Sequence, residues 1–247
     1  MDSVGNNPLL GVGIYSPSSA ARILRYEPRL VAFSARAARA WAIGHGPTRP
    51  VFVRQLAALG DAYADVLTFR DMMELFIIAS CRACGVSLQS IRIISERLAA
   101  LLSIESPLSV ARVWTDGLTM YADLLRQPPS PPGTAVAVED LLKHQLAIEG
   151  IVKPFMKAKL EFEGDQPARY WPDRPQGRVV LDPLRRFGRP HIAGTGIETA
   201  VLYEYVSAGE SIADVASWYD IDQGEVRAAC RYEARLRTIA APVPRAA

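Results

Sequence analysis

Three arginines in the first part of this 247-residue chain have the residue type and spacing of a phosphate-binding surface. Arg36 and Arg39 are three residues apart, so a helix over this segment places both side chains on one face. Arg22 belongs to the segment before it. A guanidinium group presents a planar fork of donors that fits a phosphate or the edge of a guanine. We therefore expect Arg22, Arg36 and Arg39 to contact DNA, together with Ser34, which begins the second segment.

The distribution of charge points to the same part of the chain. Residues 1–54 contain seven arginines and two acidic residues, whereas residues 55–127 contain six arginines and eight acidic residues. The formal net charge of the whole chain is only +2. A basic front end on a nearly neutral body favours nucleic-acid contact by the front end. The alternative is that these arginines form an ordinary solvated surface.

A second polar stripe lies close to the C-terminal end. Gln223, Arg227 and Arg231 fall at four-residue steps, and Arg235 continues the series. On a helix these residues form one stripe that could also read DNA, and we include Gln223, Arg227 and Arg231 among the expected contacts. Two glutamates beside the stripe leave open that this face is solvated or forms a dimer.

No arrangement of nucleophiles, acids or metal ligands predicts catalysis. Cys81 and Cys84 match C-x-x-C, but they fall at the end of an expected helix, where the helix dipole does not lower a thiol pKa. The histidines His45, His144 and His191 lie in different segments without metal-ligand spacing. We therefore expect no enzyme activity, no metal site and no cofactor. A sensor that uses the two cysteines is an alternative.

Helix start signals define the elements that carry the first arginines. Ser16 with Pro17 begins one helix, and Ser34 begins an Ala/Arg-rich helix. Apolar periodicity predicts two longer helices over residues 68–102. The Tyr-Ser start, the Ala-Ala-Arg-x-Leu helix and the Arg-x-x-Arg-x-Trp helix resemble those of MerR-type helix-turn-helix proteins. The turn over residues 25–32 is several residues longer than is usual in that group.

The middle of the chain contains turn-rich and strand-like segments. A run of prolines predicts a linker over residues 128–137. Before it, an Asp-Gly pair predicts a short hairpin over residues 113–121. After it, residues 160–163, 168–172 and 178–183 are expected to be short strands of one small sheet.

Residues 188–197 form a turn motif that precedes three short helices. The motif reads Gly-x-Pro-x-Ile-x-Gly-Thr-Gly-Ile. Thr199 is expected to cap the first helix, an S-x-x-D box begins the second at Ser211, and a D-x-x-E box begins the third at Asp222. Three helices with a short second and a long third fit a second helix-turn-helix arrangement.

The turn motif and its three helices resemble the family called domain of unknown function 433. The family signature is G-x-P-x-I-x-G-T-R-I, and this chain has Gly196 where the family usually has arginine. Members of the family commonly resemble VapB-type antitoxins, which pair with PIN-domain ribonuclease toxins. The resemblance therefore implies a PIN-domain-type toxin as a partner, and no role is carried over onto Gly196.

Length and composition predict a mainly α protein of two helix-turn-helix-type domains, over residues 1–127 and 138–247, with a small β element before the C-terminal trihelical unit. No segment has the pattern of a signal peptide or a membrane span, and three cysteines do not suggest a disulfide framework. We therefore expect a cytoplasmic protein.

Together these features predict an antitoxin-like regulator. It would bind double-stranded DNA as a homodimer, autoregulate its operon and neutralise a ribonuclease toxin. The alternative from another class is a protein-interaction scaffold that contacts no DNA.

Overall fold

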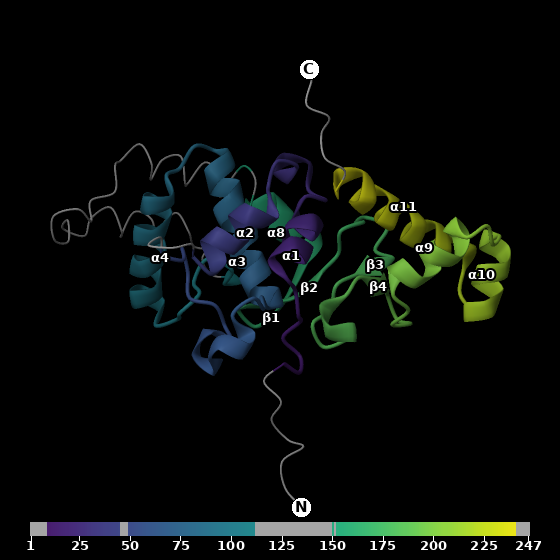
Figure 1. Cartoon of the computed structure of the whole chain (residues 1–247), viewed down its shortest axis with the longest axis horizontal. Coiled ribbons are helices and arrows are strands. Elements are labelled where there is room, and N and C mark those ends of the chain that lie inside the picture. The colour runs from purple at the N-terminus through teal and green to yellow at the C-terminus, as the bar shows by residue number, and fades with distance from the viewer. Residues whose placement is uncertain (1–8, 45–48, 112–149, 151, 241–247) are drawn as a thin grey trace, which may run out of the picture.

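The chain folds into two groups of helices with short strands between them (Figure 1). The structure, a computed structural model, describes residues 9–44, 49–111, 150 and 152–240. In chain order the helices are α1 (Pro17–Leu24), α2 (Ala35–Ala42), α3 (Phe69–Ala83), α4 (Leu88–Leu102), α8 (Lys153–Lys159), α9 (Thr199–Ser207), α10 (Ile212–Tyr219) and α11 (Gln223–Ala240). The strands are β1 (Leu160–Glu163), β2 (Gln166–Tyr170), β3 (Val179–Val180) and β4 (His191–Ile192). The predicted mainly α fold is confirmed.

Helices α1 and α2 begin as the sequence predicts and pack closely against each other. The Ser16 hydroxyl accepts a 3.1 Å hydrogen bond from the Ser19 N–H, and Pro17 occupies the first position of α1. Ala20 and Ala38, with no measurable exposure, form part of the core beneath the two helices. The turn between them contains a short 3-10 helix, η1 (Pro28–Leu30). Its buried residue, Leu30, packs in the same core and fixes the path of this long turn.

Helix α3 is the buried centre of the first group, and α4 packs beside it. Thr68 and Asp71 form a complete capping box at the start of α3, and Ser87 caps α4 through the Ser90 N–H. Most residues of α3 from Phe69 to Cys81 are buried. The predicted helix pair over residues 68–102 is therefore confirmed.

The strands form two separate two-stranded sheets instead of one. Strands β1 and β2 pair antiparallel, as do β3 and β4. A backbone bridge between Tyr170 and Leu181 connects the two pairs. The sequence did not predict β4, because it lies within the turn motif and is only two residues long. The predicted hairpin over 113–121 and the predicted linker over 128–137 lie outside the described residues.

Helices α9, α10 and α11 form the expected trihelical unit. Ser211 caps α10 by accepting from the Asp214 N–H at 3.1 Å, and the Glu225 carboxylate accepts from the Asp222 N–H at 2.8 Å. The prediction that Thr199 caps α9 was wrong, because Thr199 is already the first helical residue. Its buried hydroxyl instead donates to Glu233 of α11 at 2.5 Å.

The two groups of helices have separate cores that meet along the start of the chain. The first core contains residues of α1–α4 together with Phe155, Leu160, Tyr170 and Leu181. The second contains Val179, Ile192 and the buried faces of α9–α11. The middle segment thus packs on both cores. In the part of the chain that the structure describes, no helix is long and apolar enough to cross a membrane.

Candidate nucleic-acid interface

The outer surface of α2 presents two neighbouring arginines beside a hollow. Arg36 and Arg39 are both exposed, as their three-residue spacing predicts. They line a hollow of about 540 Å³ together with Pro17 and Ser18 from the start of α1. The cationic side chains of one helix therefore face the same open space as the N-terminal turn of the other.

The start of α2 adds backbone donors to this surface. The Ser34 hydroxyl accepts a 3.1 Å hydrogen bond from the Ala37 N–H. The N–H groups of Ala35 and Arg36 lie in the first turn, where a helix supplies no carbonyl partner. Such a helix start, with its partial positive charge, favours a phosphate group. Ser34 thus caps the start of α2. Its expected contact with DNA stays a prediction.

An acidic residue from a distant part of the chain lies against this surface. Asp65 forms a 2.6 Å ion pair with Arg39, and both side chains are more than half exposed. An ion pair so open to water contributes about 0–1 kcal/mol. A phosphate can therefore replace the Asp65 carboxylate as the partner of Arg39. Asp65 is 26 residues from Arg39 in the sequence, so no local pattern indicates this pair.

Arg22 does not lie with Arg36 and Arg39. It lines a different cavity of about 410 Å³ between α1 and the trihelical unit, whose other lining residues include Arg189, Glu198 and Glu233. Three arginines and three glutamates line this cavity, which makes it less attractive to a phosphate backbone than the hollow beside α2. The predicted set of three arginines is therefore divided between two places.

Other arginines of the basic front end have structural partners. Arg54 donates to the carbonyl oxygens of Tyr63 and Val66 at 2.9 and 3.0 Å. Arg29 donates to the carbonyl oxygen of Gly150 at 3.2 Å. The net charge of residues 1–54 therefore overstates the positive charge that is available to bind DNA. Arg36 and Arg39 are the pair that remains together on one helix face.

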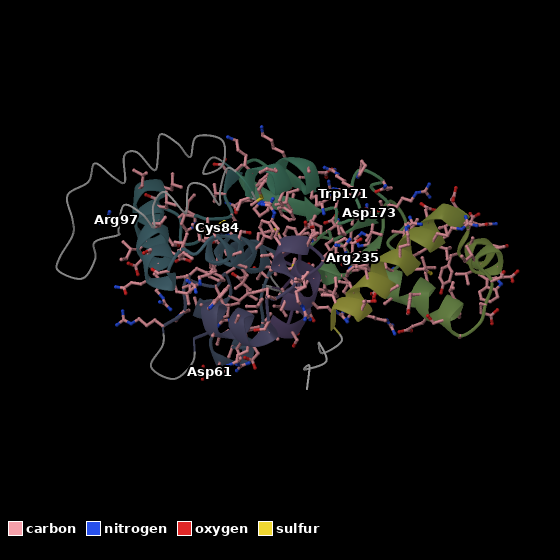
Figure 2. All side chains as sticks on the ribbon, turned by 90° about the horizontal axis from the view of Figure 1, so that it is seen from above. Asp61, Cys84, Arg97, Trp171, Asp173 and Arg235 are labelled. Atoms are coloured by element: carbon pink, nitrogen blue, oxygen red, sulfur yellow. The ribbon has the colours of Figure 1, made fainter. Side chains whose placement is uncertain are left out.

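The predicted stripe along α11 is divided as well. Arg227 donates to Gln223 at 2.9 Å one turn earlier. Arg231 lines a hollow of about 380 Å³ between α11 and the middle segment, beside Lys159 and Arg174. Arg235, which Figure 2 shows at the junction between the two groups of helices, is bound to the first group. Only Gln223 and Arg227, in the first turn of the stripe, thus lie away from the junction between the two groups of helices.

Several carboxylates flank that first turn, and one of them, Asp222, pairs with Arg178 at 3.5 Å. Residues 191–226 contain no lysine or arginine. Seven acidic residues lie in the same range: Glu198, Glu204, Glu210, Asp214, Asp220, Asp222 and Glu225. Three of them, from Asp220 to Glu225, flank the start of α11, where a reading helix would enter the groove. Like charges repel the DNA backbone, so the start of α11 is poorly suited to phosphate contact.

The turn motif of the trihelical unit retains a guanidinium group although position 196 is glycine. The Arg186 Nε donates a 2.8 Å hydrogen bond to the carbonyl oxygen of Gly196. The Arg186 side chain therefore lies against the turn at Gly196.

The surroundings of Cys81, Cys84 and His191 indicate structural roles for these residues. Burial raises the pKa of the Cys81 thiol well above its usual value, which disfavours the reactive thiolate. Cys84 caps the end of α3. His191 is buried, with Nδ1 2.9 Å from the carbonyl oxygen of Arg189. Within the described ranges, no group of three or more His, Cys, Asp or Glu side chains could hold a metal ion.

Comparisons with known proteins support the C-terminal assignment and the fold. Residues 179–232 match the family model described as "Protein of unknown function (DUF433)". A crystal structure of Rv2018 from Mycobacterium tuberculosis is similar, with a TM-score of 0.61 and 20% sequence identity over 91% of this chain and 98% of that chain. At this identity the similarity shows a shared fold. No curated protein matches the chain.

Proposed function

We propose that this chain is a DNA-binding, antitoxin-like regulator that uses α2 as its DNA-contacting helix. The observation that carries the proposal is the surface formed by Arg36, Arg39 and the open first turn of α2. Arg36 and Arg39 line one hollow there, together with Ala35 at the first position of the helix. This is the donor set that binds phosphate and guanine edges.

The surroundings of the two candidate helices favour α2 over α11 as the helix that contacts DNA. The free end of α11 is flanked by carboxylates, and its later arginines face the junction between the two groups of helices. Gln223, Arg227 and Arg231 are therefore secondary candidates. Homodimerisation belongs to the proposal, because two copies on symmetric half-sites multiply the contacts of two short helices.

The antitoxin part of the proposal rests on the family resemblance of the C-terminal unit. It implies that a PIN-domain-type ribonuclease is bound and neutralised. A scaffold that contacts no DNA remains the competing function, and DNA binding separates the two.

A salt titration of DNA binding tests the proposal. Fluorescence anisotropy would compare a duplex from the region upstream of the coding sequence with a scrambled duplex at several salt concentrations. We expect a preference for the upstream duplex and an affinity that falls steeply with salt. Replacing both arginines, Arg36→Ala with Arg39→Ala, should weaken binding and reduce the slope of log K against log salt by about 1.8, since each phosphate contact adds about 0.9.

Arg185→Ala is the matched control, because Arg185 is exposed, does not belong to α2 and does not line the hollow. It should leave the affinity and the slope unchanged. Equal binding of the upstream and scrambled duplexes at every salt concentration would instead favour the scaffold. Full binding by the double variant would show that DNA is contacted elsewhere.

A further inference from the structure

Helix α10 carries more apolar surface than the trihelical unit buries. Its sequence is Ile-Ala-Asp-Val-Ala-Ser-Trp-Tyr, yet only Val215 and Ala216 are buried. Trp218 is 56% exposed. A helix with this composition normally covers its apolar residues with a neighbouring element. Figure 1 shows α10 at the outer end of the second group of helices, away from the first group.

Three aromatic side chains form a connected surface across α9 and α10. Tyr205 of α9 is 42% exposed, and its ring lies 5.7 Å from the Trp218 ring in an edge-to-face arrangement. The Tyr205 ring also lies 6.0 Å from that of Tyr219. These ring contacts hold the side chains in place before any partner binds, which lowers the entropy lost on binding. We call Tyr205, Trp218 and Tyr219 the aromatic face.

Acidic residues flank the aromatic face. Asp214 is exposed one helical turn before Trp218, so the two side chains share a side of α10. Glu210 and Asp220 are exposed in the loops that flank the helix, and neither forms an ion pair with another described residue. Of the seven carboxylates between residues 191 and 226, Glu198 and Asp222 are paired with arginines. The exposed charged residues from Tyr205 to Asp220 in the sequence, Glu210, Asp214 and Asp220, are thus all acidic.

This charge limits what can bind. Nucleic acid and anionic lipid surfaces are negative and are repelled by carboxylates. A basic protein surface is attracted, and exposed tryptophan and tyrosine are typical anchors of protein interfaces.

We propose that the aromatic face docks a protein whose contacting surface is basic, of the kind that itself binds nucleic acid. The inference rests on the proposed function in one respect: the partner is then the ribonuclease that the chain neutralises. The carboxylates around the aromatic face then cover the basic surface with which the ribonuclease would bind RNA. Binding of the ribonuclease therefore also neutralises it.

The test measures binding of the purified product of the reading frame next to that of this chain, by isothermal titration calorimetry. Trp218→Ala should weaken the complex by at least about 30-fold, the loss expected for an interface anchor. Asp214→Lys keeps the aromatic rings and should weaken the complex and reduce the salt dependence of its affinity. Leu101→Ala is the matched control, because Leu101 is an exposed apolar residue of α4 in the other group of helices.

Each outcome decides the inference. Unchanged affinity for Trp218→Ala, or no binding of the neighbouring product by the wild-type chain, overturns it. Dissociation of a wild-type dimer by Trp218→Ala, seen by light scattering, would show that a second copy covers the face and would overturn it too. Circular dichroism checks that both variants are folded. The DNA affinity of Trp218→Ala should equal that of the wild type, so failure here is distinguishable from failure of the DNA-binding proposal.

Discussion

The hydroxyl of Tyr15 donates a 2.7 Å hydrogen bond to the carbonyl oxygen of Gly188, which is 173 residues further along the chain. Tyr15 directly precedes the cap of α1, and Gly188 begins the turn motif of the trihelical unit. The Ile14 N–H also donates to the Phe187 carbonyl oxygen at 2.9 Å. The start of α1 is therefore fixed to the second group of helices, and the orientation of α1 and α2 depends on this joint.

Replacing Gly188 with alanine should destabilise the protein by about 2–4 kcal/mol. Gly188 has φ +78°, and a Cβ built on it would lie close enough to the Tyr15 hydroxyl to force one of them to move. The free energy of unfolding in urea measures the loss. Gly194→Ala is the control, because Gly194 has φ +80° but open space around its Cβ position. A similar loss for both variants would mean that backbone strain, and not the contact with Tyr15, dominates.

Local signals predicted most of the helices but not the contacts between them. Ser16, Ser34 and Ser211 cap helices as predicted, because a cap depends on residues within one turn. The predicted cap at Thr199 was wrong because the Thr199 hydroxyl donates to Glu233, which is 34 residues away. The Tyr15–Gly188 joint has no local signature for the same reason.

The candidate DNA contacts show the same difference between local signals and contacts between helices. The shared face of Arg36 and Arg39 follows from helical spacing alone. The separation of Arg22 from that face depends on how α1 packs against the trihelical unit, and the position of Arg231 depends on the middle segment. Neither position follows from the spacing of residues within one helix.

Replacing Arg235 with methionine should destabilise the protein by about 1–2 kcal/mol. The Arg235 guanidinium donates a 2.7 Å hydrogen bond to the Tyr26 carbonyl oxygen and lies 4.2 Å from the centre of the Tyr26 ring. Methionine keeps the apolar stem and removes both interactions. Urea unfolding measures the change, with Arg185→Met as the control. Equal stability of the two variants would show that Arg235 does not hold the two groups of helices together.

The stability of the protein should fall as the pH rises through the neutral range. Burial raises the pKa of Glu74 to about 7, although the Ser109 N–H donates to its carboxylate at 2.7 Å. Because the folded state holds this proton more tightly than the unfolded state, the stabilisation is complete below about pH 4.5 and is lost as the pH rises through about 7. The expected loss is on the order of 3 kcal/mol.

Glu74→Gln isolates this contribution. The variant cannot ionise at this position, so its free energy of unfolding in urea should decline less between pH 5 and pH 8 than that of the wild type. The difference between the two proteins cancels the titrating groups that do not interact with Glu74. A constant difference across the pH range would show that Glu74 does not titrate there.

Replacing Asp65 with asparagine should strengthen DNA binding. Asp65 now pairs with Arg39 at 2.6 Å, and this exposed pair is one that a phosphate must displace. Removal of a surface partner of this kind changes a binding free energy by about 0.2–1 kcal/mol, which corresponds to an affinity gain of about 1.4- to 5-fold. Anisotropy with the upstream duplex at low salt measures the gain. In the Arg39→Ala background the same substitution should have a smaller effect, because the arginine that Asp65 restrains is gone. An equal gain in both backgrounds would mean that Asp65 only repels DNA at a distance and that Arg39 does not make the contact.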